Sequence, residues 1–247
     1  MRHLLLDPPC LPLLPGTVQV WVLPDADVQA ACSALAHTLS PDEHERARRY
    51  QREPHRDRFI ARRGMLRWLG SGYLGCAPES LCFHFDGFGK PGLQRAAMPE
   101  SELAFSVSQT QSMALLAFAW DCSVGVDVEQ LMDGVDITSV GREVFSLAEE
   151  RALHAARPAS AAAFFSTWTR KEALLKAVGT GLSLQASSYT TQDDRQRESR
   201  WRASRNGLPL AGWTFLDLML TPGVRAALAV SRRDAQVWLN LCAPWPT

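Results

Sequence analysis

An apolar strand that carries two acidic residues constrains this chain more than any other segment. In the run Val124–Glu129, valines alternate with Gly125, Asp127 and Glu129. Side chains two positions apart on a strand share a face, so the two carboxylates are expected on one face of a sheet and the valines on the other, against a core. Carboxylates this close repel each other unless a cation or a basic side chain offsets them. We therefore expect positive charge near this strand.

The helical run Trp168–Lys176 is the natural partner of that strand. Forty residues separate Asp127 from Trp168, the first residue of this run. Glu172 and Lys176 are four positions apart and share one helix face. Each run alone has an ordinary alternative, a solvated strand end for the two acids and a surface ion pair of about 0.3–0.5 kcal/mol for the helix. Together they favour a magnesium ion held against a pyrophosphate, because magnesium takes oxygen ligands and completes its shell with substrate phosphates. This chemistry is typical of phosphoryl-group transfer.

The remaining patterns predict two α+β halves. Strands are expected at 17–23, 81–85, 103–107, 113–120, 124–129, 187–191, 213–220, 225–230 and 236–241. Helices are expected at 27–38, 41–51, 55–69 and 161–178, and a capping box formed by Ser146 and Glu149 predicts one more. Residues 192–209 are expected to form an exposed loop or hairpin tip. Because helices precede antiparallel strands twice, we predict two similar halves, 1–120 and 121–247, joined near Asp121.

Composition excludes several classes of protein. The chain has 26 Lys+Arg and 26 Asp+Glu, a formal net charge of +0, so nothing global favours nucleic acid or a membrane surface. No stretch reaches the roughly 20 apolar residues of a membrane span, and the start is too short and proline-broken for a signal peptide. The six cysteines lack metal-site spacing. We expect a cytoplasmic protein, and a monomer, since each half can cover the apolar face of the other.

The ordered motifs resemble those of a known family, the 4′-phosphopantetheinyl transferases of the surfactin-synthetase-activating type. The resemblance is carried by Gly-Val-Asp-Val-Glu at 125–129 and Trp-Thr-Arg-Lys-Glu-Ala-Leu-Leu-Lys at 168–176. It extends to Ser-Pro-Asp-Glu at 40–43, Gly-Lys-Pro at 89–91, Phe-Ser-Leu-Ala-Glu-Glu at 145–150 and Gly-Thr-Gly-Leu-Ser at 179–183. Each piece is weak alone, but the set follows the family's order over residues 39–183.

The resemblance implies a pseudo-dimer of two α+β halves, with the active site in the cleft between them. It implies that coenzyme A and magnesium bind there, and that the 4′-phosphopantetheine arm passes to a serine hydroxyl of an acyl, peptidyl or aryl carrier protein, releasing adenosine 3′,5′-bisphosphate. Matched by position, Asp127, Glu129 and Glu172 would be the metal ligands. Lys176 and the neighbouring Lys171 would stabilise charge on the pyrophosphate and the leaving group.

Two glutamates remain candidates for the base that accepts the serine proton. Glu172 could act directly or through a metal-bound water, and Glu149 is the alternative. Glu149 also has a competing structural role, closing the capping box with Ser146.

The nucleotide contacts follow from the resemblance as well. Arg58, Arg63 and Lys90 would bind the phosphates of the nucleotide, with Pro91 in the same turn as Lys90. The arginine fork suits such contacts, whereas the other arginines near these positions are interleaved with acids and are expected to be solvated.

One position departs from the family. Where the family has Asn-x-Ser-His-Ser, this chain has Ser-Val-Ser-Gln-Thr at 106–110, so Ser108 is retained and Gln109 replaces a histidine taken to contact the 3′-phosphate. Glutamine donates a hydrogen bond but carries no charge. This leaves as an alternative a non-catalytic relative that binds a carrier protein or a nucleotide. Nucleic-acid binding by the arginine-rich helices is disfavoured by the interleaved acids and the zero net charge.

Overall fold

The computed structural model describes residues 13–85, 87, 91–95, 103–132, 144–155, 161–180, 186–194 and 199–242. Its helices are α1 (Val28–Leu35), α2 (Pro41–Arg48), α3 (Glu53–Leu74), α5 (Leu147–Ala155) and α6 (Ala161–Val178). Its strands are β1 (Thr17–Pro24), β2 (Leu81–Phe85), β3 (Pro91–Arg95), β4 (Leu103–Gln109), β5 (Met113–Trp120), β6 (Val124–Gln130), β7 (Tyr189–Asp193), β8 (Trp201–Arg205), β9 (Leu208–Pro209), β10 (Thr214–Asp217), β11 (Val224–Val230) and β12 (Gln236–Leu241). Short 3-10 turns flank several of them. No helix in these ranges is long and apolar enough to cross a membrane.

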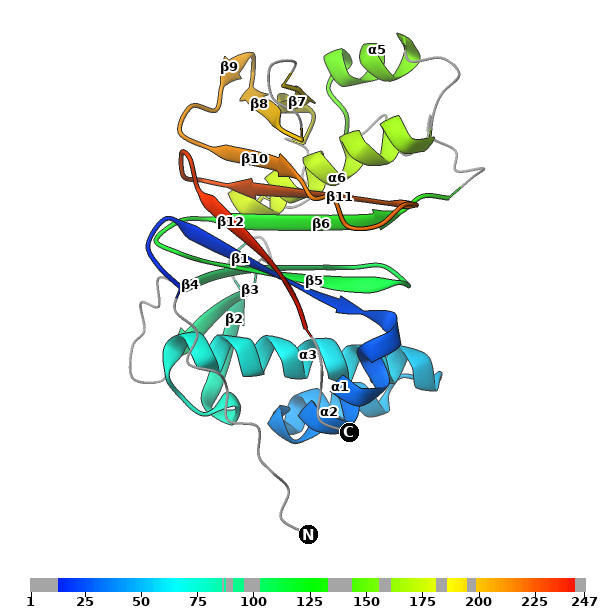
Figure 1. The fold of residues 1–247 in the computed structure, drawn as a ribbon, viewed down its shortest axis with the longest axis vertical. Coiled ribbons are helices and arrows are strands. Elements are labelled where there is room, and N and C mark those ends of the chain that lie inside the picture. The colour runs from blue at the N-terminus through cyan, green and yellow to red at the C-terminus, as the bar shows by residue number, and fades with distance from the viewer. Residues whose placement is uncertain are drawn as a thin grey trace.

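Two sheets lie face to face, and each is covered on its outer side by helices (Figure 1). The first sheet has the order β12-β1-β5-β4 and the second the order β10-β11-β6. The valines of β1 and β6 pack between the sheets, as the alternation in Val124–Glu129 predicts. Separate apolar clusters join α1 and α3 to the first sheet and α6 to the second. The predicted α+β class, with helices on antiparallel sheets, is confirmed.

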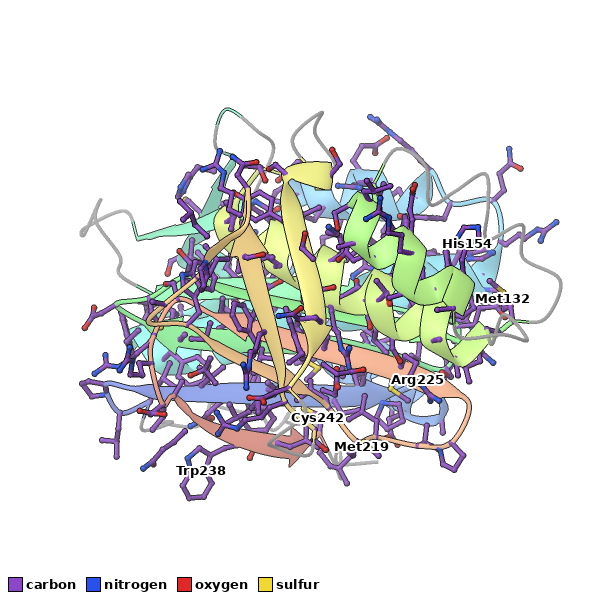
Figure 2. The ribbon with its side chains drawn as sticks, turned by 90° about the horizontal axis from the view of Figure 1, so that it is seen from above. Met132, His154, Met219, Arg225, Trp238 and Cys242 are labelled. Carbon is purple, nitrogen blue, oxygen red and sulfur yellow. The ribbon has the colours of Figure 1, made fainter. Side chains whose placement is uncertain are left out.

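The chain passes from the first sheet to the second at Asp121, where the backbone has a left-handed φ of 55°. The division into halves at 120/121 stays a prediction, and this turn lies at its proposed boundary. One strand of the second half returns, however, because β12 pairs in parallel with β1 at the edge of the first sheet. Trp238 projects outward from this edge strand (Figure 2), and 59% of its surface is exposed.

Helix α3 is longer than predicted. The glycine at position 70 was expected to end it, but the helix continues to Leu74 and stops at Gly75, whose φ is 60°. Gly70 instead serves close packing, since a Cβ there would lie 3.3 Å from side-chain atoms of Leu81 and Leu93. The two glycines therefore have different physical roles, and a left-handed φ occurs only at the second.

Of the two alternatives predicted for 192–209, an exposed loop or a hairpin tip, the hairpin is closer to the structure, because β7 and β8 pair in antiparallel fashion. Residues 201–205 form β8, which pairs with β7 and β9 in a small sheet. Trp201 is only 2% exposed and packs against Phe215, with the ring centroids 4.4 Å apart and the ring planes tilted by 31°. The polar residues Arg202, Ser204 and Arg205 obscure this strand in the sequence, where the buried positions are Trp201 and Ala203 alone.

Candidate active site

A cavity of about 510 Å³ lies where β4 of the first sheet meets β6 of the second. Its walls come from α3 and β4 of the first half and from β6 and α6 of the second. The lining residues are Arg62, Val107, Ser108, Gln109, Asp127, Glu129, Trp168, Glu172 and Lys176. Six of the predicted site residues are therefore brought together, although they come from segments far apart in the sequence.

Gly125 lets β6 approach α6 closely enough for their polar side chains to meet. A Cβ at this position would lie 2.0 Å from the carbonyl oxygen of Ala173 and 2.5 Å from the backbone nitrogen of Ala177. Both atoms belong to the helix backbone and cannot rotate away. Only glycine fits this contact, which sets the spacing between Asp127 on the strand and Glu172 on the helix.

We expect Gly125→Ala to destabilise the protein by about 3 kcal/mol, at the upper end of the usual cost of overpacking, because the helix backbone must move. Urea unfolding measures this change. Gly87→Ala is the matched control, since a Cβ there meets nothing within 4 Å. Equal urea midpoints of unfolding for Gly125→Ala and Gly87→Ala would contradict this prediction, since α6 could then move aside without cost.

Serine side chains of β4 connect the first half to the edge of the second sheet. Ser106 and Ser108 each accept a hydrogen bond from a backbone N–H of β6, at 3.1 Å from Val126 and 3.2 Å from Val128. Ser108 also donates to Oδ1 of Asp127 at 2.7 Å. These contacts satisfy edge groups of β6 that no strand pairs with, and they orient the Asp127 carboxylate.

Lys176 supplies the positive charge expected near the acidic strand. Its Nζ donates to Asp127 Oδ1 at 2.7 Å and to the carbonyl oxygen of Val126 at 3.3 Å. Two buried carboxylate oxygens, Asp127 Oδ2 and Glu172 Oε1, have no hydrogen-bond partner among the described residues. One lysine thus neutralises only part of the charge of Asp127, Glu129 and Glu172.

The pKa values report the same excess of negative charge. Burial, followed by the charge of Asp127, raises the pKa of Glu172 to about 7, and Lys176 offsets this only in part. Burial and Asp127 also raise the pKa of Glu129, against a hydrogen bond from Trp168. In the described ranges, no three Asp, Glu, His or Cys side chains are close enough together to hold a metal ion in their present positions. The unpartnered oxygens are nevertheless ligands of the kind that a hard cation takes.

Glu149 and Lys171 do not reach the cavity. They form a buried ion pair of 2.7 Å, with side chains 1% and 0% exposed. Glu149 closes the capping box with Ser146 and accepts two further hydrogen bonds from Thr191. Lys171 donates to the carbonyl oxygens of Ala186 and Tyr189. This geometry is at odds with the predicted catalytic role of Glu149 and phosphate-binding role of Lys171, because both groups are fully occupied in the core.

The predicted arginines are also differently placed. Arg63 is ion-paired with Glu43 and lies 3.6 Å from the ring centroid of Phe83, outside the cavity. Arg58 lines a smaller adjoining cavity and is bound to Asp25. Pro91 pairs with Phe85 in the β2–β3 hairpin, away from the cavity, and Lys90 lies outside the described residues.

Three lining residues, Arg62, Val107 and Trp168, are not among the predicted site residues. For Arg62, helical periodicity could have predicted a place in the site. Arg58 and Arg62 are four positions apart and share a face of α3, whereas Arg63 and Arg67 share the neighbouring face, where both meet Glu43.

Comparison with known proteins identifies the family of this site. The model of the 4′-phosphopantetheinyl transferase superfamily matches residues 123–229, the segment that holds β6 and α6. The chain is 40% identical over 179 residues to the 4′-phosphopantetheinyl transferase HetI of Nostoc sp., which covers 71% of this chain and 74% of that protein. The chain belongs to the 4′-phosphopantetheinyl transferase superfamily.

More distant members of the superfamily match shorter parts. The L-aminoadipate-semialdehyde dehydrogenase-phosphopantetheinyl transferase of Eremothecium gossypii is 36% identical over 126 residues, 48% of this chain and 44% of that protein. The 4′-phosphopantetheinyl transferase AcpT of Escherichia coli K12 is 32% identical over 127 residues, 51% and 60% of the two chains. The predicted enzyme class, a phosphopantetheinyl transferase, is confirmed, and the predicted family is confirmed as far as the superfamily.

Proposed function

We propose that this transferase moves the 4′-phosphopantetheine group of coenzyme A to a serine hydroxyl of an acyl, peptidyl or aryl carrier protein, with magnesium bound by Asp127, Glu129 and Glu172. The observation that carries the proposal is the pair of buried, unpartnered carboxylate oxygens on Asp127 and Glu172, two residues that line one cavity together with Glu129 and Lys176. Oxygens buried without a partner are costly, and a divalent cation would satisfy both.

Different residues of the cavity have different roles in the proposed reaction. Lys176 and Arg62 are the cations that can face the phosphates of coenzyme A. Magnesium, when bound, neutralises the charge of the pyrophosphate. Glu172 accepts the proton of the serine hydroxyl as the serine oxygen attacks the β-phosphorus. The bond from the β-phosphorus to the bridging oxygen breaks, and Lys176 stabilises the negative charge on the departing adenosine 3′,5′-bisphosphate.

We further propose a monomeric enzyme of the surfactin-synthetase-activating type. One chain supplies every wall of the cavity, from α3 and β4 on one side and β6 and α6 on the other, which supports a site complete without a second subunit. The five cysteines in the described ranges are free thiols, which supports the cytoplasm as its location. Service to carriers of fatty-acid or secondary-metabolite biosynthesis follows by family analogy.

Intact mass spectrometry of an apo carrier protein tests the function. Incubation with the enzyme, magnesium and coenzyme A should add one phosphopantetheine arm, and EDTA should abolish the gain, since the three carboxylates then lack their cation. Manganese added after EDTA should restore it. A folded protein that binds coenzyme A yet modifies neither acyl nor peptidyl carriers would instead be a non-catalytic relative.

A further inference from the structure

A second cavity of about 310 Å³ adjoins the active-site cavity. The two share Arg62 and Gln109, which therefore stand at the boundary between them. Tyr50 and Phe59, with ring centroids 5.5 Å apart, supply an aromatic wall, and His55 lies beside them near the beginning of α3. The second cavity is thus a continuation of the active site along α3.

Arg62 differs from Arg58 and Arg63 in having no acidic partner in the part of the chain that the structure describes. Arg58 makes two hydrogen bonds with Asp25, at 2.6 and 3.1 Å, and Arg63 is paired with Glu43. Among the described residues, no carboxylate forms an ion pair with Arg62. Burial, with smaller contributions from the positive charges of Arg46 and Arg63, lowers its pKa. A half-buried guanidinium in this setting gains most from a bound anion.

Coenzyme A carries phosphates at two places, a pyrophosphate and a 3′-phosphate on the ribose. The active-site cavity, with its carboxylates and Lys176, suits the pyrophosphate. We propose that Arg62 binds the 3′-phosphate of coenzyme A at the boundary of the second cavity, and so supplies from α3 the positive charge that Gln109 on β4 does not carry. The inference rests on the proposed function and assigns a specificity-determining residue to it.

Arg62 and Gln109 contribute differently to binding of the 3′-phosphate. The planar fork of arginine makes two charge-assisted hydrogen bonds to phosphate oxygens, whereas a glutamine amide contributes one neutral hydrogen bond. Arg62 therefore sets the preference for a phosphorylated ribose, and Gln109 adds a contact that an unphosphorylated ribose can also use.

The test compares coenzyme A with 3′-dephospho-coenzyme A as phosphopantetheine donors to one apo carrier protein. Wild-type enzyme should prefer coenzyme A, and Arg62→Gln should reduce the ratio of the two kcat/KM values by about 10- to 100-fold, the range for one lost charge-assisted hydrogen bond. Any loss common to both donors cancels in this ratio. Arg62→Lys, which keeps the charge without the fork, should lose less.

A control variant and a rescue variant test whether the preference depends on a positive charge at this place in the cavity. Arg48→Gln removes an exposed arginine of the same half, 74% exposed and remote from both cavities, and should leave the ratio unchanged. In the Arg62→Gln background, Gln109→His at acidic pH should restore part of the preference, because the charge then comes from the opposite wall. An unchanged ratio in Arg62→Gln would overturn the inference.

Binding gives a readout that does not depend on turnover. By isothermal titration, wild-type protein should bind adenosine 3′,5′-bisphosphate more tightly than adenosine 5′-monophosphate, and Arg62→Gln should bind the two equally. If the wild-type protein modifies no carrier protein, the proposed function fails. If it does so but Arg62→Gln still distinguishes the two nucleotides as the wild type does, only the inference fails.

Discussion

Replacement of Glu172 by glutamine should lower kcat/KM for phosphopantetheine transfer by about 10³-fold, because it removes both a proposed metal ligand and the proposed base in an isosteric change. The carrier-protein mass assay with initial rates measures this loss. Glu79→Gln, which removes an exposed carboxylate remote from the cavity, is the matched control and should keep normal activity. Near-normal turnover of Glu172→Gln would contradict the assignment of Glu172.

The same variant should fold at least as well as the wild type. Burial and Asp127 raise the pKa of Glu172 from 4.5 to about 7. The folded state therefore binds the proton more tightly than the unfolded state, and ionisation costs stability as the pH rises through about 7. Glutamine does not ionise. At pH 8 without metal, differential scanning calorimetry should show a melting temperature equal to or above that of the wild type, so that lost activity cannot be attributed to unfolding.

Replacement of Lys171 by methionine should have the largest effect on stability. It leaves the carboxyl group of Glu149 buried without its 2.7 Å partner, a change that costs about 3–5 kcal/mol. For a chain of this size, a loss of that order lowers the melting temperature by roughly 10 °C. Thermal unfolding followed by circular dichroism measures the shift. Activity at low temperature should survive better than stability, since Lys171 lies outside the cavity.

The double variant Glu149→Leu/Lys171→Met isolates the ion pair. Removing both charges should recover part of the stability lost in Lys171→Met, because no unpaired charge then remains in the core. Arg48→Met, which breaks an exposed pair with Glu45, should change stability by less than about 1 kcal/mol. If Lys171→Met instead abolished activity at an unchanged melting temperature, the phosphate-binding role predicted from sequence would be correct.

Local patterns in the sequence were sufficient for the elements that carry the chemistry. The predicted bounds of β5, α6 and β12 agree with the structure, as does the alternation that turns Asp127 and Glu129 away from the valine core. Backbone periodicity alone decides which side chains share a face, so Glu172 and Lys176 could be placed on one side of α6 without knowledge of the fold.

Positions that depend on the partner of a side chain could not be predicted in this way. Arg62 and Arg63 are adjacent in the sequence and chemically identical, yet the second is paired with Glu43 and the first faces the cavity. A helix turns by 100° between them. Only the packing of α1 and α2 against α3 decides which of the two side chains points to the cavity and which to an acidic partner.

The sequence by itself determined the superfamily, the α+β class and the acidic strand and helix of the site, because these follow from short-range periodicity and ordered motifs. Only the tertiary structure decided that Glu149 and Lys171 are a core ion pair, that β12 returns to the first sheet and that Arg62 borders two cavities. The physical reason is that burial and charge pairing depend on residues far away along the chain, which become neighbours only when the chain folds.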